Sequence, residues 1–167
     1  MPKLIDRHRL LDGLGHGGWI TFTGNAADIA PGSRVLLPLN ELLEYGETWR
    51  RHVGATGALG ARLTGADDPA SVLPLFDDLA LIAVEFPSFA DGRGYSIATL
   101  LRTRHHYRGE LRAVGDVLRD QLFLMARAGF DTFALRDDQH VDRALAAFRD
   151  FSVTYQHAAD RALALAA

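Results

Sequence analysis

The sequence predicts an α/β fold of about five βα units with parallel strands. Short apolar runs alternate with segments of helical periodicity from residue 35 onward, as in strands joined by crossover helices. The run at 79–86, LALIAVEF, is almost continuously apolar, which is typical of a parallel strand covered on both faces. Five units cannot close an eight-stranded barrel. We therefore expect a TIM-like partial barrel or an open sheet, with a flavodoxin-like order as the alternative.

Residues 1–34 are rich in glycine, and we expect a small N-terminal β-like arm there, ahead of a single βα-repeat domain over 35–167. WITFT at 19–23 predicts a short strand that pairs with another at 3–5. Three glycines in the arm match G-x-G-x-x-G, but a dinucleotide site needs a strand before this motif and a helix after it. Because a charged segment precedes it and a strand-like one follows, we interpret the glycines as a turn.

Short apolar runs followed by helix-starting residues predict the first two βα units. VLLPL at 35–39 predicts a strand, and Asn40 is placed to cap a helix that runs to about Val53. ARLTG at 61–65 predicts the next strand. Asp67, Asp68 and Pro69 then open a short helix, since proline fits an early helical position.

The third and fourth units begin with the clearest strands, at 79–86 and 110–115. Ser96 is expected to cap the helix after the first of them, and Asp116 the helix at 117–128. Gly129 is expected to end that second helix.

The fifth unit begins with a strand at 131–136. Asp137 or Asp138 is expected to cap a last helix, whose apolar residues repeat at helical spacing as far as Phe151.

Polar side chains gather where these strands end. Ligands of open α/β sheets and barrels bind outside the carboxyl ends of the strands. The candidate residues for an anion-binding or functional surface are Glu85, Asp91, Arg93, Ser96, Arg112, Asp116, Arg119, Asp120 and Arg136.

Two interpretations of these residues stay open. Arg93, next to a helix start, forms a receptor for a carboxylate, sulfate or phosphate, unless Asp91 pairs with it. Arg112 lies inside an apolar strand, where a charge needs a partner, and Glu85 on the neighbouring strand is the expected one. Arg119 and Arg136 either join Arg93 in a positive crevice or belong to a closed network of ion pairs.

Composition narrows the function classes. The net charge is −3 and the pI is about 6.1, so we expect no nucleic-acid partner. The absence of cysteine excludes disulfides and thiolate-bound clusters. No run approaches the roughly 20 apolar residues of a membrane span, and no signal peptide is evident, so we expect no membrane partner and a cytoplasmic protein. No histidine pair has metal-site spacing, so we expect no metal and no other cofactor.

Two strings carry a family resemblance. AVEFPSFADGRGYSIATLLR, with its DGRGYS motif, and GELRAVGDVLRDQLFLMARAGFDTFALR resemble a bacterial family of unknown function. Its members are described as oxidoreductases involved in sulfite reduction, and their genes lie beside those of assimilatory sulfite and sulfate reduction. The family's R-C-G-F reads Arg127-Ala128-Gly129-Phe130 here, so a redox role of that cysteine does not carry over.

The resemblance implies an accessory protein of assimilatory sulfite or sulfate reduction that acts with sulfite reductase or its electron donor. The alternative is a binding protein or enzyme for a small anion, using the arginine-rich crevice at the strand ends. A homodimer is a third expectation, because uncovered strand edges must be covered.

Overall fold

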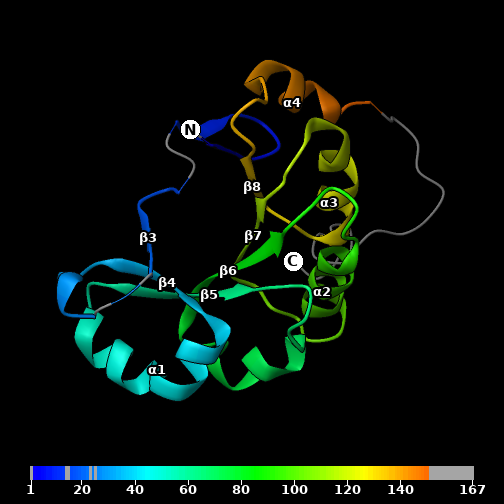
Figure 1. The fold of residues 1–167 in the computed structure, drawn as a ribbon. Coiled ribbons are helices and arrows are strands. Elements are labelled where there is room, and N and C mark those ends of the chain that lie inside the picture. Colours follow the sequence, from blue (N-terminus) through cyan, green and yellow to red (C-terminus); the bar gives the residue numbers. More distant parts are fainter. Residues whose placement is uncertain (1, 14–15, 23, 25, 151–167) are drawn as a thin grey trace.

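A computed structural model describes residues 2–13, 16–22, 24 and 26–150. These residues form a mixed α/β fold around one curled open sheet, a half-barrel with its helices on the outer face (Figure 1). The eight strands are ordered β2-β1-β8-β7-β6-β5-β4-β3. The mixed α/β class is thus confirmed.

Five parallel strands follow one another across the sheet in chain order. They are β4 (Arg34–Pro38), β5 (Ala58–Leu63), β6 (Leu79–Phe86), β7 (Glu110–Gly115) and β8 (Thr132–Leu135). The order of a flavodoxin-like sheet would instead reverse part-way. The predicted strand at 61–65 was misplaced, because β5 begins at Ala58, where the chain pairs with β4.

The N-terminal residues extend both edges of this sheet. β3 (Trp19–Thr21) pairs in parallel with β4, whereas β1 (Lys3–Ile5) is antiparallel to β8 and to β2 (Leu10–Asp12). The expected pairing of 3–5 with 19–23 was therefore wrong. Both edge strands have three residues, and very short edges limit edge-to-edge pairing, so the edges give no support to a homodimer.

The α-helices are α1 (Leu39–Val53), α2 (Arg93–Thr103), α3 (Leu122–Ala128) and α4 (Val141–Ala147). The 3-10 helices are η1 (Ala26–Asp28), η2 (Pro69–Leu75) and η3 (Arg119–Gln121). Asp68 caps η2 by accepting a hydrogen bond from the amide of Ala70. Gly129 ends α3 in the left-handed conformation, with φ of 110°, which glycine adopts without strain.

Four expected helix caps were wrong. Asn40 lies inside α1, which begins one residue earlier at Leu39 and has no side-chain cap. Ser96 lies within α2, whose N-cap is Gly92. Asp116 is separated from α3 by η3, and neither Asp137 nor Asp138 caps α4. The predicted extension of the last helix past 151 lies outside the described residues.

The two faces of the sheet differ in character. Ile82, Val84 and Phe86 of β6 point outward into the large core beneath the helices, and all three are fully buried. Leu81 and Ala83 point inward and join Trp19 in a smaller cluster on the concave face. Glu85 follows on that inner face by the alternation of a strand.

Residues 16–18, just before β3, lie on the concave side of the half-barrel. Arg112 donates a hydrogen bond to the carbonyl of His16, and Arg34 donates one to the carbonyl of Gly17. Gly17 has φ of +59°, and a Cβ there would lie 2.9 Å from Leu4 Cδ2. Only glycine fits this position without strain. The N-terminal residues therefore form one wall of the inner face.

Candidate functional site

The first predicted arginine site is closed by an ion pair. Arg93 Nη2 lies 2.6 Å from Asp91 Oδ2, and Arg93 Nε also donates to this carboxylate. These hydrogen bonds lower the pKa of Asp91 to about 2. The DGRGYS loop thus carries an internally neutralised pair at the start of α2.

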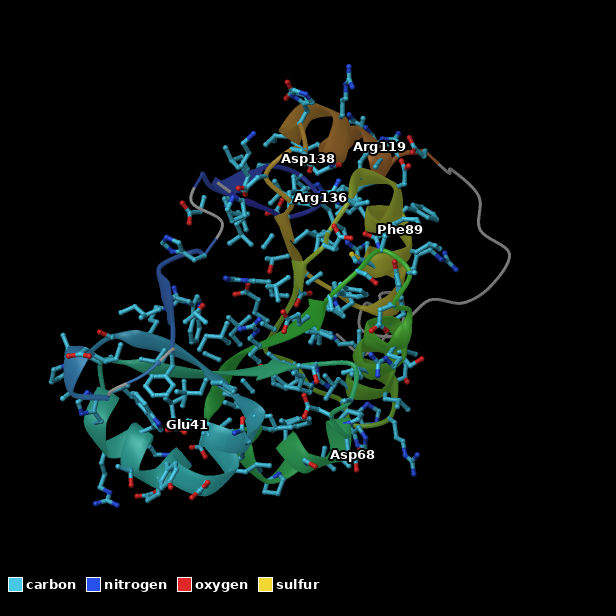
Figure 2. The ribbon with its side chains drawn as sticks, viewed as in Figure 1. Glu41, Asp68, Phe89, Arg119, Arg136 and Asp138 are labelled. Carbon is cyan, nitrogen blue, oxygen red and sulfur yellow. The ribbon has the colours of Figure 1, made fainter. Side chains whose placement is uncertain are left out.

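The second group is a network around β8 and η3 (Figure 2). Arg136 lies 2.7 Å from both Asp116 and Asp138, and hydrogen bonds from Arg136 lower the pKa of Asp138. Arg119 pairs separately with Asp120 and Asp150. Three of the predicted arginines therefore face carboxylates already, which gives no support to a free anion crevice at these positions.

Arg112 does not pair with Glu85. Its guanidinium is 4% exposed and bonds to Glu110 of the same strand, at 2.7 Å, and to the Thr132 hydroxyl. Glu85 pairs instead with Arg62 of β5, at 2.6 Å. Arg62 and Arg112 both lie opposite Ala83, on either side of β6. The register therefore allowed both partners, and the direction of the side chains decided between them.

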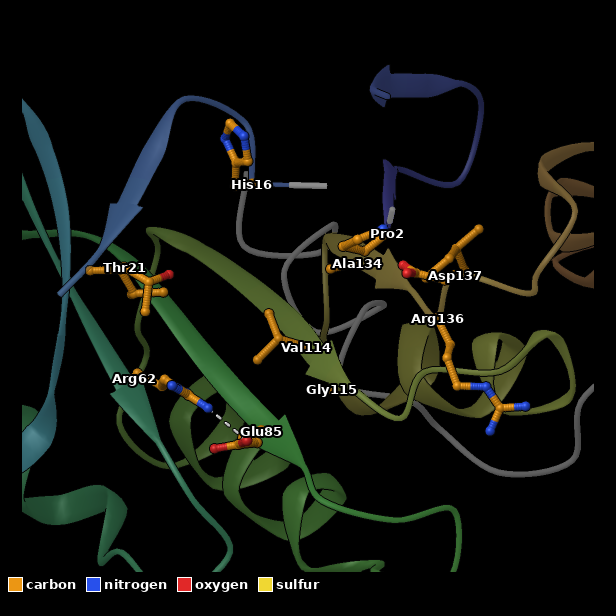
Figure 3. Close-up of a pocket in the computed structure, with 12 residues that line it drawn as sticks. Pro2, His16, Thr21, Arg62, Glu85, Val114, Gly115, Ala134, Arg136 and Asp137 are labelled. Carbon is orange, nitrogen blue, oxygen red and sulfur yellow. Dashed lines mark hydrogen bonds and ion pairs between the residues drawn. The ribbon is translucent and has the colours of Figure 1, made fainter. Parts of the chain in front are cut away.

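A cavity of about 560 Å³ opens on the inner face, toward the carboxyl ends of the parallel strands (Figure 3). The Arg62–Glu85 pair lies in its wall, and Arg136 at its far end points away from that pair. The other lining residues, mostly apolar, are Pro2, His16, Thr21, Leu36, Val114, Gly115, Ala134, Leu135 and Asp137. This cavity is the candidate site, because a concave, mostly apolar space with a few polar groups is typical of ligand-binding sites.

The Arg62–Glu85 pair keeps unused hydrogen-bonding capacity. Its side chains are 36% and 27% exposed. The pair is joined through Nη2 and Oε1. Within the described part of the chain, Nε and Nη1 of Arg62 and Oε2 of Glu85 make no other hydrogen bond. The wall of the cavity thus offers donors beside an acceptor.

A second cavity of about 580 Å³ lies toward the amino ends of the strands and shares His16 with the first. It contains Arg34 and the Glu110–Arg112 pair. Because Arg112 there is already bonded to Glu110, Thr132 and the His16 carbonyl, we assign it to holding the N-terminal segment in place. Among the described residues, no three His, Asp or Glu side chains could hold a metal ion together.

Of the predicted site residues, the structure brings only Glu85 and Arg136 to the candidate cavity. Arg62 and Thr21 were missed. Arg62 had a recognisable signal, since it is the one charge in an otherwise apolar strand and faces the same side as Glu85. Thr21 had none, because its place depends on the pairing of β3 with β4.

Comparison with protein families gives one match. A family model described as "Bacterial protein of unknown function (DUF934)" matches residues 60–166. The chain belongs to this family. The DUF934 match includes Arg62 and Glu85 and excludes Thr21 and His16, so it covers the ionic wall of the cavity but not the wall that the N-terminal residues form.

Searches of the curated proteins and of the solved structures found no match. No helix in the described part of this DUF934 chain is long and apolar enough to span a membrane.

Proposed function

We propose that this protein is an accessory factor of assimilatory sulfite reduction, acting with sulfite reductase or its electron donor through the inner-face cavity. The resemblance carried by the DGRGYS and GELRAVGDVLRDQ strings suggests the process. The single structural observation behind the mode of action is the cavity of about 560 Å³ with an ion pair in its wall.

Two features of this cavity support a binding role. It lies at the carboxyl ends of parallel strands, where ligands of related architectures bind. Its ion pair is half-buried but accessible. Arg62 keeps two guanidinium nitrogens that bond to no described residue, whereas all three guanidinium nitrogens of Arg136 already donate to carboxylates.

The test is the rate of sulfite reduction by the cognate reductase and its natural electron donor, with and without this protein. We expect the protein to raise the rate. Arg62→Gln and Glu85→Gln should abolish the increase, since each removes one charge from the cavity wall and leaves a polar side chain in its place.

Arg93→Gln is the matched control, because it removes an ion-paired charge outside the cavity. If Arg93→Gln alone abolished the rate increase, the DGRGYS loop and not the cavity would be the surface that acts on the reductase. An unchanged rate with the wild-type protein would remove the proposed role in sulfite reduction.

A further inference from the structure

The Arg62–Glu85 pair makes the cavity wall selective by charge. A simple anion drawn to Arg62 also meets the negative charge of Glu85, and a simple cation drawn to Glu85 meets Arg62. At the 2.6 Å separation of this pair, neither charge can be approached without the other. The wall is therefore matched to a molecule that carries both charges side by side.

We propose that the cavity binds a small zwitterion, an α-amino acid, whose carboxylate meets Arg62 and whose ammonium group meets Glu85. The two charged groups of an α-amino acid are attached to one carbon atom, so they are adjacent in space like the charges of the pair. Arg62 retains Nε and Nη1 as donors, and Glu85 retains Oε2 as an acceptor, within the described residues. The ligand can thus bind without first breaking the pair.

The rest of the cavity suits the remainder of such a ligand. Leu36, Val114 and Ala134 provide apolar surface for its side chain. The volume of about 560 Å³ lies inside the range of about 300–1,000 Å³ that is usual for small-molecule sites. The hydroxyl of Thr21 lines the same space and makes no hydrogen bond to another described residue.

Isothermal titration of the full chain with each of the standard L-amino acids tests this inference. We expect binding of at least one of them. Its methyl ester, which lacks the carboxylate charge, and its N-acetyl derivative, which lacks the ammonium charge, should each bind about tenfold more weakly or worse, because each loses a charge-assisted hydrogen bond.

Two single-charge variants and one control variant test whether the Arg62–Glu85 pair binds the amino acid. Arg62→Gln and Glu85→Gln should each weaken binding by about tenfold or more, while Arg51→Gln should leave it unchanged, since Arg51 is a 73% exposed residue of α1. Val114→Phe fills the cavity without changing charge and should also abolish binding. Failure of every amino acid to bind the wild-type protein, or wild-type affinity in both charge variants, would overturn the proposal.

This inference rests on the proposed role of the cavity as the working surface, but the two fail separately. Binding is measured on the isolated protein, and stimulation is measured with the reductase. Stimulation without amino-acid binding would reject only the ligand, whereas binding without stimulation would reject only the role in sulfite reduction.

Discussion

Glu110 and Arg112 stand two residues apart on β7, and their side chains meet on the inner face of the sheet with Oε1 and Nη2 2.7 Å apart. The guanidinium of Arg112 is 4% exposed, and it also donates to the carbonyl of His16. One buried side chain therefore links a central strand to residue 16, on the concave side of the half-barrel.

Arg112→Met should lower the free energy of unfolding by about 1–3 kcal/mol, because the carboxylate of Glu110 loses its charged partner. Glu110 then keeps only the hydrogen bond from the Thr132 hydroxyl among the described residues. Urea unfolding of both proteins measures this difference. Proteolysis should also cut at residues 16–18 faster in the variant, since the bond to the His16 carbonyl is lost.

The double variant Arg112→Met/Glu110→Leu separates the two contributions. Removing both charges should restore part of the lost stability, because no unpaired carboxylate remains. Arg51→Met, at an exposed position of α1, should change stability by no more than about 0.5 kcal/mol. If Arg112→Met matched Arg51→Met, the buried pair would have no structural role.

Two helical glycines should respond to alanine in opposite directions. A Cβ at Gly46 in α1 would be 3.8 Å from Leu42 Cδ1, an ordinary contact. Gly46→Ala should therefore stabilise the protein by about 0.5–1 kcal/mol through helix propensity. A Cβ at Gly94 in α2 would be 2.6 Å from Cζ of the fully buried Phe86.

Gly94→Ala should accordingly destabilise the protein by about 1–3 kcal/mol, since a closely packed ring cannot move away without disturbing the core. Thermal or urea unfolding of the two variants in parallel gives the comparison. Stabilisation by both would mean that α2 does not pack against Phe86 as closely as described.

The strands could be predicted from sequence because their signals are local. β6 at 79–86 and β7 at 110–115 have the expected bounds, since continuous apolar runs followed by polar turns identify buried strands. The helix starts were harder to predict. Asp116 is a residue type that often caps helices. Its carboxylate instead accepts a hydrogen bond from the amide of Phe89 and pairs with Arg136, and both partners are distant in sequence.

The candidate site could be predicted only in part. Strand register gives the face of the sheet on which a side chain lies, but not the end of the strand toward which a long side chain extends. Arg62 and Arg112 are both opposite Ala83, and so equally near Glu85 by register. Contacts with Glu110, Thr132 and the His16 carbonyl draw Arg112 toward the amino end of β7. The last of these contacts depends on the N-terminal residues, and no local pattern predicts that His16 lies beside β7.

The Asp91–Arg93 pair gives a prediction that depends on pH. Hydrogen bonds from Arg93 lower the pKa of Asp91 to about 2, below the ordinary value of about 4. Since the folded-state pKa is the lower one, the pair contributes to stability above about pH 4, and this contribution is lost as the pH falls through about 2.

NMR titration of the Asp91 carboxyl carbon in the wild type and in Arg93→Gln tests that assignment. The pKa of Asp91 should rise toward about 4 in the variant, because the guanidinium is the main cause of its lowering. The pKa of Asp138, which depends on Arg136, should stay low in both proteins and serves as the internal control. An Asp91 pKa near its ordinary value in the wild type would mean that Arg93 is not held by this pair, and the guanidinium would then be available to a ligand at the start of α2.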